Sequence, residues 1–230
     1  MKLRAPFRRS GTPGFRITTR GDKTAMILER FEVGPFLENT YVIGDEATGE
    51  AYIVDPGGEN RRITAFIEKK NLKPLAIICT HGHIDHIAGA AELQKLSGLP
   101  LKIHHGDEAL VGQAPLAARM FGIPAVEIPQ IDGFFEEGDV LKAGSVELRV
   151  IHTPGHSMGG VCFLGDGFIL AGDTLFQMSI GRTDLPGGSY KTLLASIKEK
   201  LLTLPDDTVV YPGHGPSTSI GFERENNPFL

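Results

Sequence analysis

The chain has 230 residues, of which 41% are hydrophobic and 22% charged, and its formal net charge is −5 at pH 7. This composition is typical of a soluble globular protein with one good-sized domain or two small ones. The apolar runs are of strand length, far short of the roughly 20 residues of a membrane helix. We therefore predict no transmembrane segment and no membrane partner.

Positive charge is concentrated at the start of the chain. Residues 1–25 carry seven basic side chains and one acidic side chain, Asp22, which leaves 16 basic and 27 acidic residues in the remainder. An acidic body repels phosphate backbones, because nucleic-acid binders need clustered Lys and Arg. We therefore expect no nucleic acid among the partners.

The same 25 residues show no apolar periodicity and contain Gly11, Pro13 and Gly14. They predict a solvated, disordered tail, followed by one domain over residues 26–230. Three interpretations of the tail stay open: a true start near Met26, plain disorder, or an organelle transit peptide, which would also be rich in Arg and poor in acidic residues.

After the tail, periodicity predicts strands and helices in alternation. In the first half, the predicted strands are 26–33, 40–43, 51–54, 75–79 and 101–103, and the predicted helices are 60–70 and 87–96. In the second half, the predicted strands are 146–151, 160–163, 168–171 and 208–211, and the predicted helix is 190–202. Two β-rich halves, each closed by helices, predict an α+β fold in which two sheets pack face to face with helices outside, an αββα sandwich.

Only two cysteines occur, Cys79 and Cys162, and each lies inside an apolar, strand-like stretch. We interpret both as free core thiols rather than a disulfide, which suits a reducing compartment. We therefore expect a cytoplasmic protein, with organelle targeting by the basic tail as the alternative.

A polar cluster follows the predicted strand 75–79. Residues 80–86 read Thr-His-Gly-His-Ile-Asp-His. Burying so many titratable groups is costly unless a cation compensates them, and imidazole with carboxylate is the ligand set of zinc, iron and related ions. His81 and His83 can converge from an extended turn, whereas Asp85 and His86 lie nearer to the next helix. The cluster therefore predicts a metal centre with two positions.

Three later motifs each place one potential ligand after an apolar strand. They supply His156 in Thr-Pro-Gly-His-Ser, Asp173 in Gly-Asp-Thr and His214 in Tyr-Pro-Gly-His-Gly. Each is weak evidence alone, because a single histidine after a strand is more often a hydrogen-bonded structural residue. Together, and in this order, the three motifs are specific.

The HxHxDH pattern with the later His, Asp and His resembles the metallo-β-lactamase superfamily over nearly all of residues 26–230. The resemblance implies a sandwich of two facing mixed β-sheets and two divalent metal ions, which we expect to be Zn²⁺, with Fe or Mn as alternatives. It implies one ion on His81, His83 and His156, a second on Asp85, His86 and His214, and Asp173 bridging both. Asp85 and Asp173 are then the catalytic carboxylates, and Asp85 orients the attacking hydroxide.

Four segments resemble glyoxalase II-like proteins most closely, in particular the short bacterial form without the family's C-terminal helical domain. They are Asp-Pro-Gly-Gly at 55–58, Gly-Arg-Thr-Asp at 181–184, Pro-Gly-His-Gly-Pro at 212–216 and Asn-Pro-Phe-Leu at 227–230. The resemblance implies hydrolysis of a small acyl thioester such as S-lactoylglutathione. Only sixteen residues follow His214, so we expect loose recognition of glutathione, which the missing domain helps to hold.

The best-known subclass of true β-lactamases has a cysteine at the position of Asp173. No cysteine follows Gly172 here. We therefore do not expect antibiotic hydrolysis as the main activity. The expected partner is a small-molecule thioester, and the oligomeric state stays open.

Other polar residues receive weaker interpretations. Arg182 is a candidate anchor for a substrate carboxylate, with a structural ion pair to Asp184 or another acidic residue as an equal alternative. His104 and His105 are expected at a pocket rim or cap, and His152 in a packing or supporting role. Thr80 and Ser157 have two alternative roles: they either orient the metal ligands or cap turns.

Two other functions compete with thioester hydrolysis. Persulfide dioxygenases share the scaffold and resemble residues 181–184, and their single iron could use His81, His156 and Asp173. A binding module without catalysis is the remaining alternative, and the seven complete ligands count against it.

Overall fold

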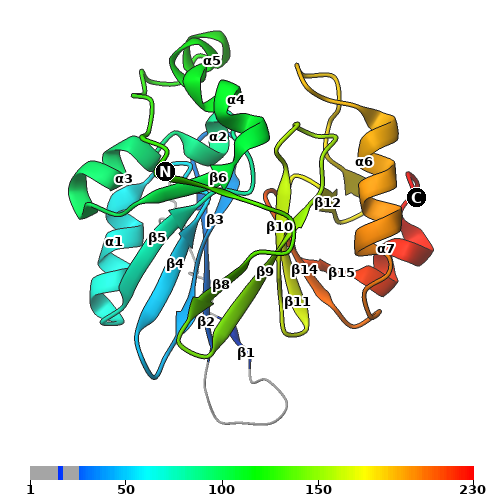
Figure 1. Ribbon diagram of the computed structural model, residues 1–230, viewed down its shortest axis with the longest axis horizontal. Helices are drawn as coiled ribbons and strands as arrows, with labels where there is room; N and C mark the ends of the chain where they lie inside the picture. Colours follow the sequence, from blue (N-terminus) through cyan, green and yellow to red (C-terminus); the bar gives the residue numbers. More distant parts are fainter. Residues whose placement is uncertain (1–14, 18–25) are drawn as a thin grey trace, which may run out of the picture.

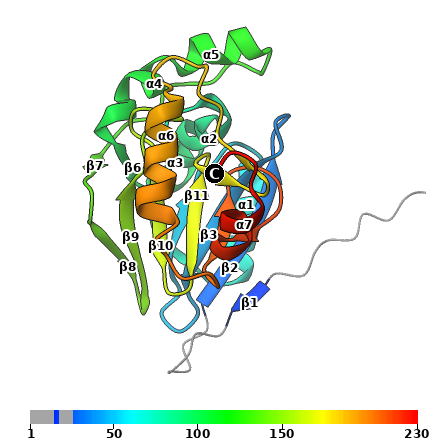
Figure 2. The ribbon, with the colours of Figure 1, turned by 90° about the vertical axis from the view of Figure 1, so that its right-hand side faces the viewer.

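The computed structural model describes residues 15–17 and 26–230 of the chain. Two β-sheets pack face to face, and helices cover the outer face of each sheet (Figures 1 and 2). The αββα sandwich predicted from the sequence is therefore the observed fold. Both cysteines are buried and free, as predicted.

The first sheet changes from antiparallel to parallel along its width. Its strand order is β1-β2-β3-β4-β5-β6-β7, with antiparallel pairs up to β4 and parallel pairs from β4 to β7. The strands are β1 Phe15–Ile17, β2 Met26–Val33, β3 Glu38–Asp45, β4 Glu50–Val54, β5 Lys73–Ile78, β6 Leu101–His104 and β7 Gly133–Phe135. Because β4, β5 and β6 are parallel, the loops that follow them meet at one edge of the sheet.

The second sheet has the order β15-β14-β11-β10-β9-β8, in which only the β11–β14 pair is parallel. Its strands are β8 Val140–Ala143, β9 Val146–His152, β10 Val161–Gly165, β11 Phe168–Gly172, β14 Val209–Pro212 and β15 Thr218–Ser219. A small hairpin, β12 Leu175–Phe176 with β13 Ser179–Ile180, lies between β11 and β14 in the chain.

The helices divide between the two outer faces and the upper end in Figure 1. They are α1 Asn60–Lys69, α2 Ile84–Ile87, α3 Ala90–Ser97, α4 Glu108–Gly112, α5 Ala114–Phe121, α6 Tyr190–Ser196 and α7 Ile220–Asn226, with a 3-10 turn His105–Asp107 and a π-type turn Ile197–Leu201. In the described part of the chain, no helix is both long and apolar enough to cross a membrane.

Three apolar clusters fill the spaces between the four layers. One joins the first sheet to α1 and α3 and includes Ile63 and Leu93. The second lies between the sheets, where the rings of Phe135 and Phe163 meet edge to face at 5.5 Å. The third joins the second sheet to α6 through Leu193. These packed layers provide a rigid frame for the loops at the strand ends.

The structure differs most from the prediction in residues 105–145, where it contains α4, α5, β7 and β8. The sequence indicates a helix after His105 but none of the strands there. The structure also contains β12, β13, β15 and α7, which the sequence did not predict. Within the predicted tail, Phe15–Ile17 forms β1, which pairs with the start of β2. The rest of the tail prediction concerns residues outside the described ranges.

Candidate metal centre

The seven predicted ligands gather at the end of the sandwich that carries α2 in Figure 1. Asp85 and His86 lie in α2 itself, and the other five lie on loops. Four of them follow β5, and the others follow β9, β11 and β14. The loop after β5 belongs to the first sheet, and the other three loops belong to the second. The centre is therefore assembled between the two sheets, from residues that are far apart in the chain.

Three imidazoles converge at what we name the first position. His83 Nδ1 lies 2.8 Å from His156 Nε2, which lies 3.2 Å from His81 Nε2. Two nitrogens bound to one tetrahedral ion at about 2.0–2.1 Å are about 3.3–3.4 Å apart. The three donor atoms are therefore close to the spacing that a single cation requires.

A carboxylate and two imidazoles form the second position. Asp85 Oδ2 lies 3.1 Å from His214 Nε2 and 3.9 Å from His86 Nε2. Asp173 lies between the two positions, with Oδ1 3.3 Å from His86 Nε2 and Oδ2 3.5 Å from His156 Nε2. The same Oδ2 is 3.7 Å from His214 Nε2. Asp173 is thus placed to contact ions at both positions.

Two of the donor atoms are buried without any hydrogen-bond partner. They are His86 Nε2 and Asp173 Oδ1. Leaving a buried polar atom unpaired costs free energy, so such an atom calls for an explanation. A cation between these atoms satisfies both, so the residues present fit a binuclear metal centre.

The opposite ring nitrogens fix how the imidazoles present their donor atoms. His156 Nδ1 donates to Arg182 O at 2.7 Å, and His214 Nδ1 donates to Phe36 O at 3.1 Å. Because a carbonyl oxygen only accepts hydrogen bonds, both Nδ1 atoms carry the proton. In the neutral rings, each Nε2 therefore keeps a free lone pair directed at the centre.

The surroundings also shift the pKa values of the ligands. Burial, together with neighbouring imidazoles, lowers the pKa of His81 well below its ordinary value and that of His83 to about 4. Burial would raise the pKa of Asp173, but His86 and the other imidazoles lower it below its ordinary value. These three ligands are therefore in their metal-binding forms at neutral pH.

His86 differs from His81 and His83 in the direction of its pKa shift. Burial lowers its pKa, but the carboxylates of Asp173 and Asp85 outweigh burial and raise it. A proton on His86 neutralises the same carboxylates as a metal ion bound beside it. Protonation of this ring and metal binding to it therefore compete.

Behind the ligands lies Asp55, which the sequence motif contained but to which no role was assigned. Its side chain accepts hydrogen bonds from Thr80 N and Thr80 Oγ1, each at 2.6 Å, and from His86 Nδ1 at 3.0 Å. Thr80 Oγ1 also lies 3.1 Å from His81 Nδ1. Thr80 therefore orients a ligand, one of its two predicted roles. The signal for Asp55 was its place at the end of β4, next to the strand that carries the histidines.

The predicted anchor Arg182 forms a two-pronged ion pair with Asp184. Its Nε and Nη2 each lie 2.7 Å from a carboxylate oxygen of Asp184, and both side chains are exposed. The structure thus shows the ion pair that was the alternative to an anchor.

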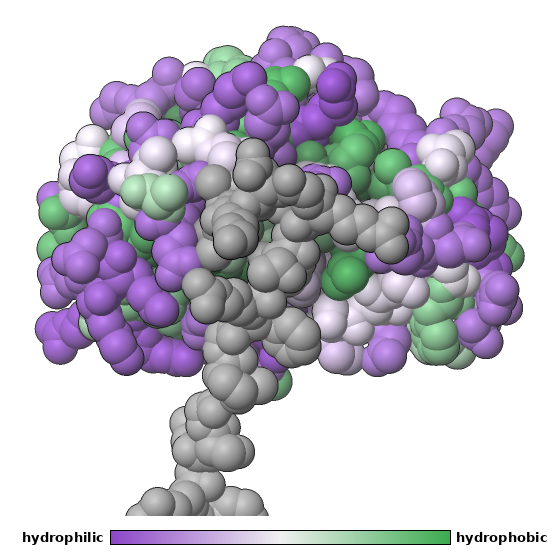
Figure 3. All heavy atoms as spheres, turned by 90° about the horizontal axis from the view of Figure 1, so that it is seen from below, coloured by the Kyte–Doolittle hydropathy of each residue, from purple (hydrophilic) through white to green (hydrophobic). Residues whose placement is uncertain are grey.

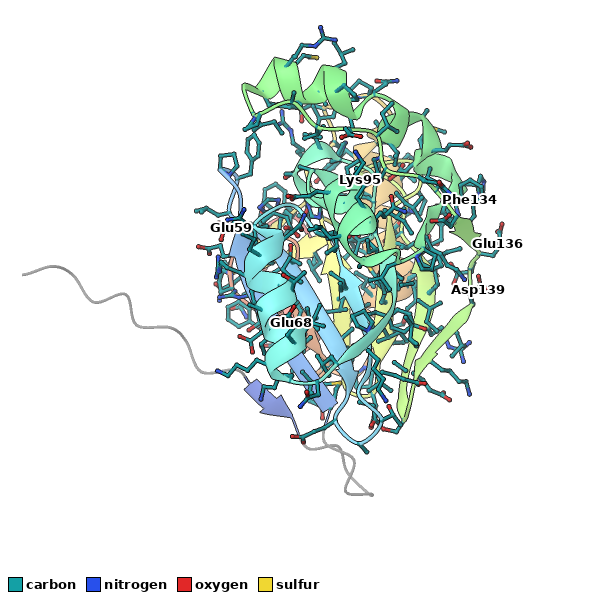
Figure 4. All side chains as sticks on the ribbon, turned by 90° about the vertical axis from the view of Figure 1, so that its left-hand side faces the viewer. Glu59, Glu68, Lys95, Phe134, Glu136 and Asp139 are labelled. Carbon is teal, nitrogen blue, oxygen red and sulfur yellow. The ribbon has the colours of Figure 1, made fainter. Side chains whose placement is uncertain are left out.

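A separate group of potential ligands consists of His104, His105 and Glu136. His104 Nδ1 accepts a hydrogen bond from Gly106 N at 3.1 Å, and its ring stacks on His152 at 4.1 Å. Glu136 points outward at the edge of the sheet (Figure 4). Since His104 caps the following turn and stacks on a ring of the second sheet, its geometry is that of the predicted cap.

A hollow of about 380 Å³ lies at the end of the sheets opposite the seven ligands, lined by residues such as Val146 and Phe168. It contains none of the ligands. That end, seen in Figure 3, presents many hydrophilic residues beside smaller apolar patches. The chemistry of the side chains, rather than the size of a hollow, therefore locates the candidate site.

Comparisons with known proteins agree with this geometry. The sequence pattern of the Metallo-beta-lactamase superfamily matches residues 33–214. Hydroxyacylglutathione hydrolase GloC of Haemophilus influenzae is 39% identical over 209 residues, which cover 89% of this chain and 98% of that protein.

Two solved structures are similar over almost their whole length. The BLEG-1 B3 metallo-beta-lactamase has 37% identity and a TM-score of 0.82, with coverage of 89% of this chain and 99% of that one. TTHA1623, solved in a di-iron-bound form, has 40% identity and a TM-score of 0.80, with coverage of 88% and 100%.

Proposed function

This chain belongs to the metallo-beta-lactamase superfamily and is a metal-dependent hydrolase, and we propose that it cleaves small acyl thioesters such as S-lactoylglutathione. The observation that carries the proposal is the complete set of seven ligands, with Asp173 between two groups of three. The similarity to a hydroxyacylglutathione hydrolase supports the thioester. The match covers 98% of that relative, so the activity in its name does not depend on a further domain that lies outside the matched region.

The chemistry requires a polarised carbonyl and an activated water. Two divalent cations, which we propose to be Zn²⁺, supply both when they occupy the two positions. Iron is the alternative, since the similar structure TTHA1623 was solved with two iron ions. A thioester suits such a site, because its thiolate leaves without needing much protonation.

The chain's own residues hold and orient this centre. Asp173 reaches towards both positions, and Asp85 is placed at the more open one, where its carboxylate can orient the attacking water. His156 and His214 keep their Nε2 lone pairs directed inward through their bonds to backbone carbonyls.

Apolar side chains border the second position and indicate which part of a substrate could bind there. The ring of Phe176 lies 6.2 Å from that of His214. Phe36, whose carbonyl oxygen accepts a hydrogen bond from His214 Nδ1, packs its ring edge to face on Phe121 at 5.8 Å. Arg182 is already paired with Asp184. We therefore expect contacts with the acyl group to matter more than contacts with the charged ends of glutathione.

From this we predict broad substrate scope. Several small acyl thioesters should be turned over, and the KM for the glutathione thioester should not be sharply lower than the others. Steady-state kinetics on a series of acyl and thiol groups, with Arg182→Ala beside the parent protein, measures this. Tight saturation by the glutathione thioester alone, lost in Arg182→Ala, would show that Arg182 is an anchor after all.

A second candidate is a mononuclear iron dioxygenase that acts on a persulfide. The observation in its favour is that His81, His156 and Asp173 already form two imidazoles and a carboxylate on one side of the centre. This triad is the ligand set of many non-heme iron oxygenases.

One experiment separates the candidates. Protein purified without added metal is analysed for bound metals and then assayed with S-lactoylglutathione, with glutathione persulfide in an oxygen electrode, and with a chromogenic cephalosporin. We expect two metal ions per chain and thioester hydrolysis. A single iron with oxygen uptake would establish the dioxygenase, and faster turnover of the cephalosporin would establish a β-lactamase, the activity in the name of BLEG-1.

A further inference from the structure

Asp107 ends the 3-10 turn after β6, and its side chain is completely buried, at 0% exposure. Its Oδ2 accepts hydrogen bonds from Gly82 N at 2.9 Å and Ser157 Oγ at 2.7 Å. Its Oδ1 accepts one from Gly159 N at 2.6 Å. One carboxylate therefore accepts three hydrogen bonds from two loops, which belong to different sheets.

The donors of these bonds adjoin the ligands of the first position. Gly82 lies between His81 and His83, and Ser157 follows His156. Asp107 is itself outside the three-histidine group. Its carboxylate thus forms hydrogen bonds with both ligand-bearing loops, the one after β5 and the one after β9.

The backbone is shaped for this approach. A Cβ atom on Gly159 would lie 2.6 Å from Asp107 N, and one on Gly82 would lie 3.0 Å from Asp107 O. Contacts this short leave almost no room for a side chain at either position. The two glycines therefore allow both loops to close on the turn that carries Asp107.

The first position needs such a connection, because its ligands come from both sheets. His81 and His83 follow β5 of the first sheet, and His156 follows β9 of the second. One backbone bond, from Val161 N to Thr80 O at 2.8 Å, joins the bases of the two loops. The three bonds to Asp107 lie further along the same loops, beside the ligands themselves.

We propose that Asp107 is a positioning residue for the first metal position: it sets the distance between the two loops so that His81, His83 and His156 share one ion. This inference rests on the proposed function only in requiring that the protein binds metal. It makes no use of the substrate. Loss of the carboxylate should weaken the first position selectively, on the scale of 10- to 100-fold that is typical of residues supporting metal ligands.

The chain offers a matched control in Asp45, a buried aspartate that also joins the two sheets. Its carboxylate accepts hydrogen bonds from Ala47 N at 2.7 Å and Thr48 N at 2.8 Å in the β3–β4 turn, and from Ser145 N at 2.8 Å in the β8–β9 turn. These turns lie at the lower end of the sandwich in Figure 1. Asp45→Asn therefore removes a comparable bond between the sheets without touching the ligand loops.

The test compares Asp107→Asn, Asp45→Asn and the parent protein in their binding of Zn²⁺ alone. Competition with a chromogenic chelator gives the affinity of each ion. Nitrogen NMR of protein labelled with ¹⁵N-histidine shows which rings bind zinc, because the imidazole shifts differ between free and metal-bound nitrogen. In Asp107→Asn we expect His81, His83 and His156 to lose zinc at a concentration at which His86 and His214 keep it.

Asp45→Asn should bind both ions like the parent protein. If Asp107→Asn does not fold, Ser157→Ala removes one of the three bonds and keeps the carboxylate, and it should weaken the first position about 2- to 10-fold. Equal weakening of both positions, the same change in Asp45→Asn, or an unchanged first position in the variant that folds would overturn the proposal. Thioesterase activity does not enter this test, so a failure of the proposed function would be recognised separately.

Discussion

The two metal positions share one cluster but differ in composition and burial. The first consists of three imidazoles, and two of these residues, His81 and His156, are only 1% and 4% exposed. The second includes a carboxylate and is more open, since the side chains of Asp85 and His214 are 20% and 27% exposed. From this difference we expect the first position to hold its ion more firmly and the second position to contact water and substrate.

Asp173 joins the two positions, so its removal should have the largest effect. Asp173→Ala removes the carboxylate between two cations and leaves their repulsion uncompensated in a buried site. We expect zinc to be lost from both positions and kcat/KM for thioesters to fall by roughly two or more orders of magnitude. Metal analysis and thioester kinetics measure this, with the exposed Asp166→Ala in the β10–β11 turn as control. Two retained ions and near-normal turnover would refute the binuclear assignment.

Changing His214 should separate the two positions. His214→Ala removes one ligand of the second position and leaves the three imidazoles of the first intact. We expect about one zinc ion per chain and a loss of activity of roughly 10-fold, smaller than that of Asp173→Ala, because one cation can still activate water. The same metal count and kinetics apply, with the exposed His105→Ala as control. Loss of both ions would mean that the positions do not fill independently.

A smaller effect, on stability alone, is expected far from the ions. Burial would raise the pKa of Asp45, but hydrogen bonds from Ser145 and from backbone amides outweigh it and lower this pKa to about 2. A lowered pKa in the folded state stabilises the protein above the unfolded pKa, and this contribution is lost as the pH falls towards 2. Asp45→Asn should therefore lower the stability of metal-free protein by about 1–3 kcal/mol at pH 7, and by less at pH 3. Urea unfolding at both pH values checks this, and an equal loss at both would contradict it.

The smallest effect should come from starting the chain at Met26. Within residues 1–25 the structure describes only Phe15–Ile17, which adds three residue pairs at the edge of the first sheet. We expect both metal positions and the activity to be unchanged, and the melting temperature to fall by no more than about 3 °C. Thermal unfolding and thioester kinetics on the shortened chain measure this. A large loss would show that the segment packs on the domain or belongs to an interface.

Where the elements are long, the sequence predicted them well. Strand β2 was predicted with its observed bounds, and α1 with an error of one residue. Residues 105–145 were not predicted well, because α4 has five residues and β7 only three. Such lengths are too short for apolar periodicity to stand out, and their structure depends on packing against β6 and β9.

For the site, the sequence could predict the seven proposed ligands and suggest Thr80 and Ser157 as supporting residues. It could not predict the aspartates that accept hydrogen bonds from these two residues, Asp55 from Thr80 and Asp107 from Ser157. Histidines clustered after a strand are improbable without a metal, so they stand out. Asp55 and Asp107 are single aspartates after β4 and β6, and such residues are common in turns. Their roles become visible only when the parallel order of β4, β5 and β6 brings the three loops together.

Strand β3 ties the loop of His214 to the beginning of the domain. Asn39 Nδ2 donates to Pro212 O and to Gly215 O, each at 2.9 Å, and Tyr41 OH donates to Pro212 O at 2.7 Å. These contacts join residues 171 to 176 positions apart. During synthesis, the second metal position therefore cannot form until almost the whole domain has emerged from the ribosome, and refolding must first close this long loop. Until this loop closes, the chain lacks the His214 ligand of the second position, so we expect an immature chain to hold at most one ion and to reach full activity only after the last segment has docked.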